Sequence, residues 1–373
     1  MKILWLSDFD PRGSGYYNIS VPLCNRLADR GHDVKALGMH YKGQEHTHRF
    51  SLLPVRNTSE IMAMTGNLMN LWQFDVFICA LDIIHQERFL QDKMFVERKF
   101  PYVGIMPLES IPLVMDWAIV LAQMNHRLII SEFGTKEVQK MGIEAEYLQI
   151  GVDKSQWYPV TKEERTNARN VLGVKEDEFV VLTVADNQER KNLSAALEIF
   201  KDFAKDKPVK YVLVTREFNI VGWKLRSYAA ELGIVDKFIL IERGMNVEQL
   251  RLIYGASDVF FLPSKAEGLG MPLLEAMAVG IPCIGTNNTG IADLLADGRG
   301  ILVDYEYTHR DPFGNGYRYW INKDQAVEKL NQVYQDGYDT TSSTDYVDKL
   351  DWKIAIETIE KVMDNVTKKT TTN

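Results

Sequence analysis

Two glutamates eight positions apart, Glu267 and Glu275, bracket the segment of this chain with the clearest chemical potential. The segment follows an apolar run that is typical of a buried parallel strand. Gly268 and Gly270 let the backbone pass close to a ligand, and Pro272 suits the start of a helix. A helix start offers free N–H groups and a positive dipole end to phosphate, and neighbouring carboxylates accept hydrogen bonds from sugar hydroxyls. The segment therefore predicts a nucleotide-sugar site.

A second polar loop, residues 185–192, follows another apolar run and ends in Arg190, Lys191 and Asn192. Asparagine caps helices well, so we expect the two cations to lie just before a helix that Asn192 caps. Paired cations at a helix start counter the charge of a diphosphate and stabilise it as a leaving group. A solvated basic pair is the plain alternative, and the position after a predicted strand favours the phosphate role.

Short apolar runs alternate with helical patterns along the whole chain, which predicts doubly wound α/β sheets. The alternation occurs twice, and a polar, proline-containing connection at residues 151–159 separates the two halves. We therefore expect two Rossmann-like domains, residues 1–155 and 156–345, followed by a helical segment at 346–373. Ligands bind such sheets at the carboxyl ends of the strands, so the loops of both halves are expected to face a central cleft.

Length and composition narrow the class of protein. A chain of 373 residues is long for one hydrophobic core, and a net charge of −8 argues against nucleic-acid binding. Three distant cysteines form neither a disulfide framework nor a zinc spacing. The apolar run near the first residue is too short for a signal peptide, and no stretch is long enough to span a bilayer. We expect a cytoplasmic protein that is at most peripheral to a membrane.

With these residues considered, the chain resembles the family 4 retaining glycosyltransferases, which have the GT-B fold of two Rossmann-like domains. Residues 267–275 fit the family's motif of two glutamates separated by seven residues, and residues 187–192 resemble its diphosphate-binding loop. Further similar segments are residues 151–153, 256–264 and 280–285 and the pair Thr289-Gly290. Trp352 and the helix after it resemble the terminal helix that crosses back to the first domain.

The resemblance implies a role for each part of the site. Glu267 contacts the hydroxyls of the donor sugar, and Glu275 contacts the ribose. Lys191, with Arg190, holds the phosphates, so Glu267, Lys191 and Arg190 are the expected catalytic residues. Further donor contacts are expected from Gly268, Leu269, Gly270, Met271, Gly15, Arg216 and Thr289. The structural alternatives are a favourable charge in the first turn of a helix for Glu275 and a solvated loop position for Glu267.

Three positions depart from the family pattern. Ala185-Asp186 stands where the family usually has another arginine, so the charge at the phosphate is weaker or comes from Arg190 or Arg216. Gly13-Ser-Gly15 replaces the two adjacent glycines of the family's first loop. Glu109 lies in the region where many members have a histidine that contacts the sugar.

The resemblance implies transfer of a hexose from a nucleoside-diphosphate sugar to a hydroxyl of a glycan, a lipid or a small molecule, with retention of configuration. No clear nucleophile for a double displacement is present, which favours a front-face mechanism based on positioning and charge stabilisation. Asp8-Phe-Asp10 formally matches the Asp-x-Asp metal motif of another glycosyltransferase fold, but its place in the first loop does not suit donor binding. We expect no metal and no cofactor besides the donor.

Two other functions stay open: a nucleotide-sugar epimerase of similar architecture and a non-catalytic nucleotide-sugar or glycan-binding protein. Residues 41–49 and 51–67 are expected to be loops that select the acceptor. The first of these is rich in His and basic residues and suits a phospholipid surface, an acidic glycan or plain solvent. Residues 305–319, YEYTHRDPFGNGYRY, predict an ordered loop or insertion without an assigned role. No motif indicates the donor base, the sugar or the oligomeric state.

Overall fold

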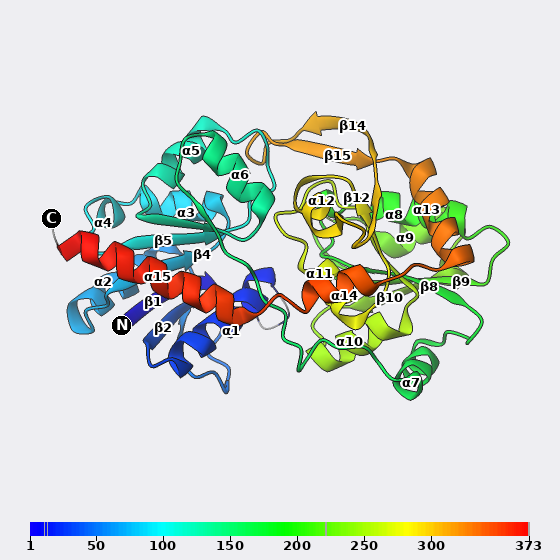
Figure 1. Cartoon of the computed structure of the whole chain (residues 1–373), viewed down its shortest axis with the longest axis horizontal. Helices are drawn as coiled ribbons and strands as arrows, with labels where there is room; N and C mark the ends of the chain where they lie inside the picture. The colour runs from blue at the N-terminus through cyan, green and yellow to red at the C-terminus, as the bar shows by residue number, and fades with distance from the viewer. Residues whose placement is uncertain (11, 13, 221, 372–373) are drawn as a thin grey trace. The chain divides into compact units, whose positions relative to one another are not determined.

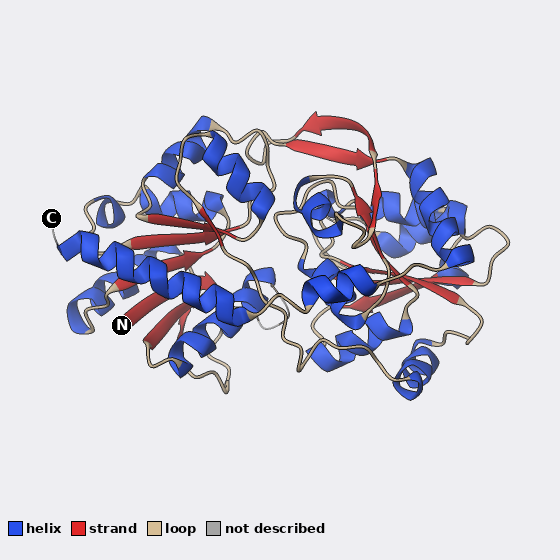
Figure 2. Ribbon diagram, viewed as in Figure 1, coloured by secondary structure: helices blue, strands red, loops and turns tan. Residues whose placement is uncertain are grey.

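The computed structural model describes residues 1–10, 12, 14–220 and 222–371. Its internal contacts divide the chain into two compact units. The first unit comprises residues 1–151, 313–316 and 351–373, and the second comprises residues 152–312 and 317–350 (Figure 1). Each unit is built on a parallel sheet with helices packed against it (Figure 2). The prediction of two Rossmann-like parallel-sheet domains is confirmed.

The first unit contains a seven-stranded sheet in the order β3-β2-β1-β4-β5-β6-β7. Its strands are β1 (Lys2–Asp8), β2 (Asp33–Met39), β3 (Ser51–Val55), β4 (Val76–Ala80), β5 (Tyr102–Met106), β6 (His126–Ile129) and β7 (Glu146–Tyr147). Its helices are α1 (Gly15–Asp29), α2 (Thr58–Leu71), α3 (Ile83–Leu90), α4 (Lys93–Val96), α5 (Met115–Ala122), α6 (Glu132–Lys140) and α15 (Trp352–Thr371). Strands β4 and β5 are buried at every residue, which explains their uninterrupted apolar sequences.

Residues 51–67 form strand β3 and most of helix α2, so the expectation of an acceptor loop there is wrong. Pro54 lies inside β3, and proline within a run argues against a central strand. Because β3 is the edge strand of the sheet, Pro54 is tolerated there. Asn57 then caps α2 by accepting a hydrogen bond from the Glu60 amide at 3.0 Å.

The second unit contains a six-stranded parallel sheet in the order β10-β9-β8-β11-β12-β13 and a separate antiparallel pair, β14-β15. Its strands are β8 (Phe179–Val184), β9 (Val209–Thr215), β10 (Phe238–Glu242), β11 (Val259–Leu262), β12 (Cys283–Thr286), β13 (Ile301–Val303), β14 (Tyr305–Arg310) and β15 (Tyr317–Ile321). Its α-helices are α7 (Lys162–Leu172), α8 (Leu193–Phe203), α9 (Leu225–Glu231), α10 (Val247–Ala256), α11 (Met271–Val279), α12 (Thr289–Leu295), α13 (Lys323–Asp336) and α14 (Thr341–Val347), and its 3-10 helices are η1 (Glu189–Lys191) and η2 (Val235–Lys237).

The order of strands positions the two polar loops of interest. In the second sheet the chain builds outward from β8 to β10 and then resumes on the other side with β11. The loops after β8 and β11 therefore leave the sheet at the point where the strand order reverses. Ligands of open α/β sheets bind at this point, beyond the carboxyl ends of the strands.

For residues 305–319 we expected an ordered loop or insertion, and the structure shows two paired strands there. They lie in the hairpin of β14 and β15, with Thr308 opposite Tyr319 and Arg310 opposite Tyr317. Aromatic and polar residues alternate along β14 and at the start of β15, which is the period-two pattern of a strand. The many polar residues and the two glycines between the strands concealed this pattern.

Candidate nucleotide-sugar site

Glu267 lies in the loop between β11 and α11 and is 5% exposed. Its carboxylate lies 2.5 Å from Lys191 Nζ and 3.0 Å from Arg190 Nη1. Arg190 also donates to the carbonyl of Ala266 at 2.5 Å. The structure thus brings the three expected catalytic residues into direct ion pairs, and the solvated-loop alternative for Glu267 is wrong.

The two cations determine the ionisation of Glu267. Burial alone would raise the pKa of this carboxyl, but Lys191 and Arg190 lower it to about 2. Glu267 is therefore a carboxylate at neutral pH and can only accept hydrogen bonds. Together the three side chains carry a net charge of one positive unit, which suits an anionic ligand.

The loop after β8 is bonded to the loop after β11 through its backbone. The Lys265 amide donates to the Arg190 carbonyl at 2.8 Å. Asn192 adopts a left-handed backbone with φ 57°, and its side chain donates to the Pro263 carbonyl at 3.1 Å. Asn192 makes no side-chain cap to α8, so the predicted capping bond is wrong. Its side chain instead ties the two loops together.

Thr289 and Gly290, at the start of α12, hold the backbone of Glu267. The Glu267 amide donates to Thr289 Oγ1 at 2.8 Å, and the Gly290 amide donates to the Glu267 carbonyl at 3.0 Å. A Cβ atom at Gly290 would lie 2.9 Å from the Gly268 carbonyl oxygen. The observed role of Thr289 is therefore to position the loop, whereas its contact with a donor stays a prediction.

Residues 268–271 lead directly into the N-terminus of α11. Gly270 has φ 95°, a left-handed conformation that favours glycine, and Met271 is the first residue of the helix. Free amides at such a terminus suit phosphate, and the donor contacts of Gly268, Leu269, Gly270 and Met271 stay predictions. In the first unit, Gly15 begins α1, and a Cβ there would meet nothing within 4 Å. Gly13 lies outside the described residues.

Glu275 is 6% exposed and lies in the middle of α11. It is not in the first turn, so the helix-dipole alternative is wrong. Tyr254 donates its hydroxyl hydrogen to Glu275 Oε2 at 2.8 Å. Burial raises the pKa of Glu275 to about 7, although the bond from Tyr254 opposes the rise. Near neutral pH this carboxyl can therefore both donate and accept hydrogen bonds.

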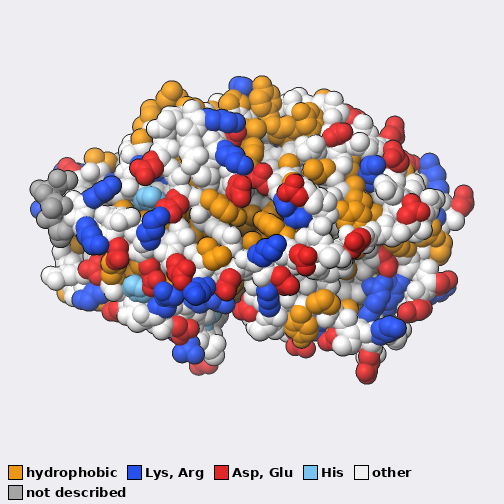
Figure 3. All heavy atoms as spheres, viewed as in Figure 1, with side chains coloured by type: hydrophobic (Ala, Val, Ile, Leu, Met, Phe, Trp, Pro, Cys, Tyr) orange, Lys and Arg blue, Asp and Glu red, His pale blue; other side chains and the backbone are white. Residues whose placement is uncertain are grey.

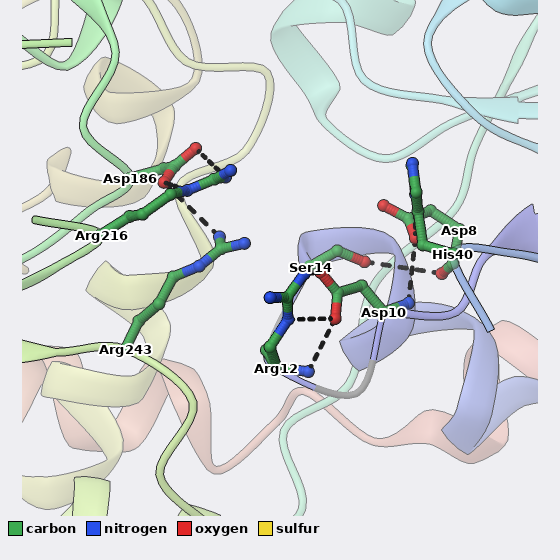
Figure 4. A network of polar contacts seen from close by, with 8 residues as sticks. All are labelled: Asp8, Asp10, Arg12, Ser14, His40, Asp186, Arg216 and Arg243. Carbon is green, nitrogen blue, oxygen red and sulfur yellow. Dashed lines mark hydrogen bonds and ion pairs between the residues drawn. The ribbon is translucent and has the colours of Figure 1, made fainter. Parts of the chain in front are cut away.

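Asp186 lies where the family pattern has an arginine, and its carboxylate forms ion pairs with two other arginines (Figure 4). Arg216, which follows β9, donates from Nε and Nη2 to the two carboxylate oxygens at 3.1 and 2.9 Å. Arg243, which follows β10, places Nη1 3.5 Å from Asp186 Oδ1. The sequence analysis named Arg216 but not Arg243, whose only sequence signal is a cation two positions after the apolar run at residues 238–241.

Asp8 and Asp10, at the carboxyl end of β1, are each paired within the first unit (Figure 4). His40 Nδ1 lies 3.1 Å from Asp8 Oδ1, and Arg12 Nη2 lies 3.0 Å from Asp10 Oδ2. Within the described part of the chain, no group of three or more His, Cys, Asp or Glu side chains is arranged to hold a metal ion.

The basic loop at residues 41–49 is held by stacked rings. The ring centroids of His46 and His48 are 4.6 Å apart, and those of His48 and Phe50 are 5.1 Å apart. Arg49 pairs with Asp29 at 3.0 Å. No helix among the described residues is both long enough and apolar enough to cross a membrane. Contact of this loop with a phospholipid surface or an acidic glycan stays a prediction.

Residues 164–339 match the family model described as Glycosyl transferases group 1. The chain is 26% identical over 181 residues to the N-acetyl-alpha-D-glucosaminyl L-malate synthase of Bacillus anthracis, which covers 48% of this chain and 44% of that protein. The chain spans less than half the length of the curated relatives that it matches.

Solved structures match over almost the whole chain. Sucrose-phosphate synthase from Thermosynechococcus elongatus aligns with a TM-score of 0.81 at 15% identity, over 98% of this chain and 99% of that one. Anabaena Alr3699/HepE in complex with UDP-glucose aligns with a TM-score of 0.77 at 14% identity, over 98% and 100% of the two chains. These similarities confirm the GT-B fold.

Proposed function

Because residues 164–339 match the family model of the glycosyl transferases group 1, we propose that this protein transfers a hexose from a nucleoside-diphosphate sugar to a hydroxyl acceptor with retention of configuration. The observation that carries the proposal is the cluster of Glu267, Arg190 and Lys191 at the strand-order reversal of the second sheet. It combines a carboxylate, ionised at neutral pH, that can accept hydrogen bonds from sugar hydroxyls with cations for a diphosphate.

The leaving group requires positive charge, and two clusters supply it. Arg190 and Lys191 share Glu267, while Arg216 and Arg243 share Asp186. Each cluster has two cations and one carboxylate, so each keeps one net positive charge. We infer that the second cluster takes the place of the arginine that is missing at Ala185-Asp186. Charges fixed before the reaction stabilise the developing diphosphate without further reorganisation.

In the front-face mechanism that we propose, the bond from the anomeric carbon to the phosphate oxygen breaks as the bond to the acceptor oxygen forms on the same face. The departing phosphate oxygen accepts the proton of the acceptor hydroxyl. The protein contributes orientation of the donor and stabilisation of the diphosphate. In this scheme Glu267 binds the sugar hydroxyls, Glu275 binds the ribose, and the protein requires no metal.

The test is to incubate the protein with UDP-, GDP- and ADP-hexoses, with and without candidate acceptors, and to measure the free nucleoside diphosphate. A transferase releases it in proportion to the acceptor, and the product's anomeric configuration, read by NMR, equals that of the donor. UDP-hexoses are the first choice because UDP-glucose is bound in the similar Anabaena structure. An epimerase would change the sugar without consuming an acceptor, and a binding protein would do neither.

Matched variants assign the site. We expect Glu267→Gln to lower kcat about a hundredfold, the usual effect of losing one electrostatic contact to a transition state. Glu178→Gln is the control. Glu178 is also largely buried and pairs with Lys210, but it lies at the amino end of β8, away from the carboxyl ends of the strands. Full activity in the Glu267 variant would remove the site assignment.

A further inference from the structure

The hairpin of β14 and β15 is the segment that the proposed donor site does not explain (Figure 1, orange). All six residues of β14 are exposed. Tyr305 is 44% exposed and Tyr307 is 52% exposed. Tyr307 stacks on Trp320 of the opposite strand, with ring centroids 5.4 Å apart and planes at 16°. His309 also contacts Trp320, with ring centroids 5.6 Å apart. Tyr307, His309 and Trp320 therefore form one surface, which we call the aromatic platform.

Contacts beneath and beside the platform fix its rings in place. Trp320 Nε1 donates to His309 Nδ1 at 2.7 Å, which requires the hydrogen of a neutral His309 to be on Nε2. The ammonium group of Lys265 lies 3.4 Å from the centre of the Trp320 ring, and that lysine side chain is 2% exposed and paired with Glu189. Rings that are already ordered lose little conformational entropy when a ligand binds.

The platform is connected to the candidate donor loop. The Tyr319 amide donates to the Lys265 carbonyl at 2.9 Å, and Lys265 lies two positions before Glu267. The hairpin therefore packs on the loop that bears the proposed sugar-binding carboxylate, within the same unit. A ligand on the platform would be adjacent to a site for sugars rather than on an unrelated surface.

The chemistry of the platform suits a carbohydrate. Tyrosine, tryptophan and histidine have apolar faces and polar edges, and sugar rings likewise have apolar C–H faces and hydroxyl edges. On β14, Glu306 and Arg310 carry opposite charges on either side of Tyr307 and His309, so the strand lacks the basic patch that binds phosphate-bearing polymers or anionic lipids. On the face shown in Figure 3, acidic and basic side chains are interspersed rather than gathered into a broad basic patch.

We propose that the aromatic platform binds a neutral oligosaccharide that forms part of the acceptor. The identification of this oligosaccharide as an acceptor rests on the proposed glycosyl transfer. Its binding to the platform does not, because binding requires neither a donor nor turnover.

The experiment is calorimetric titration of the full chain with maltohexaose, cellohexaose, chitohexaose and mannohexaose. We expect at least one of them to bind, and Tyr307→Ala to raise its Kd roughly tenfold, or about 1.4 kcal/mol. Tyr307→Phe keeps the stacking ring and should retain most of the affinity. Tyr158→Ala is the control, since Tyr158 is 44% exposed in the same unit but lies outside the hairpin; it should leave the Kd unchanged.

Three results would overturn the proposal: binding by none of the four oligosaccharides, equal binding by wild type and Tyr307→Ala, or Tyr307-dependent sedimentation with phosphatidylglycerol–phosphatidylcholine vesicles in place of sugar binding. A thermal-shift titration with UDP is run on the same preparations. If UDP and the UDP-, GDP- and ADP-hexoses fail to bind while Tyr307-dependent oligosaccharide binding persists, the proposed transferase function fails and the platform stands.

Discussion

At the residue scale, Asp186 pairs with Arg216 and Arg243, and we have proposed that these two arginines supply positive charge to a diphosphate. We predict that Arg243→Ala raises the Kd for UDP tenfold or more, because a hydrogen bond to a charged group contributes about 1.5–3 kcal/mol. Isothermal titration calorimetry measures the change. Arg165→Ala is a matched control, since Arg165 and Arg169 share Asp258 in the same way at the amino end of β11. Equal losses in both variants would indicate a structural effect rather than a phosphate contact.

Glu275 makes stability depend on pH. Its pKa is about 7 in the folded protein against 4.5 for an ordinary glutamate, because burial disfavours the carboxylate. A folded-state pKa above the unfolded value stabilises the fold fully below about pH 4.5, and this stability is lost as the pH rises through about 7. The loss is on the order of 3 kcal/mol in the free energy of unfolding.

Glu275→Gln, which cannot ionise, should therefore lose less stability than wild type between mildly acidic and mildly alkaline pH. Urea unfolding of both proteins at several pH values measures the difference. If the two pH profiles run parallel, burial does not raise the pKa of Glu275. If this residue also binds ribose, the variant should bind UDP more weakly while it gains stability at alkaline pH.

At the scale of elements, the N-terminus of α12 acts as a support for the Glu267 loop. Gly290→Ala would place a Cβ atom 2.9 Å from the Gly268 carbonyl oxygen and 3.0 Å from that of Glu267. Both neighbours are backbone atoms, so the loop must shift. We predict a loss of about 1–3 kcal/mol in stability and weaker UDP binding, measured by urea unfolding and calorimetry.

Gly66→Ala provides the comparison for this variant. Gly66 lies inside α2, and an added Cβ would meet only the Met94 sulfur at 3.8 Å. Alanine is the better helix former, so this change should leave stability equal or slightly higher and UDP binding unchanged. Weaker UDP binding in both variants would show that the loss does not come from the Glu267 loop.

Elements whose signals are local were predictable from the sequence, and those that depend on strand neighbours were not. The loops after β8 and β11 each combine an apolar run with charged or glycine residues, so their position at carboxyl ends followed from the pattern. The role of Arg243 depends on the strand order β10-β9-β8, which no local pattern predicts. The support from Thr289 depends on a contact across 22 positions of sequence. Strand β3 was missed because Pro54 is acceptable only at a sheet edge.

At the scale of the whole molecule, each unit has its own hydrophobic core. One core packs residues of the first sheet, such as Phe77 and Tyr102, and the other packs residues of the second, such as Phe200 and Tyr211. The proposed donor contacts lie in the second unit, with the exception of Gly15. A donor nucleotide should therefore stabilise the second core selectively if the units open independently.

Hydrogen exchange of the intact chain with and without UDP tests this expectation. A ligand at a hundred times its Kd stabilises the state that binds it by about 2.7 kcal/mol, which slows exchange through global opening roughly a hundredfold. With UDP, we predict this slowing for the amides of β8 and β11 and little change for those of β4 and β5. Uridine, which lacks the diphosphate, is the control ligand. Equal slowing in all four strands would mean that the two cores open as one cooperative unit. If uridine slows exchange as much as UDP does, the nucleoside and not the diphosphate provides the binding energy.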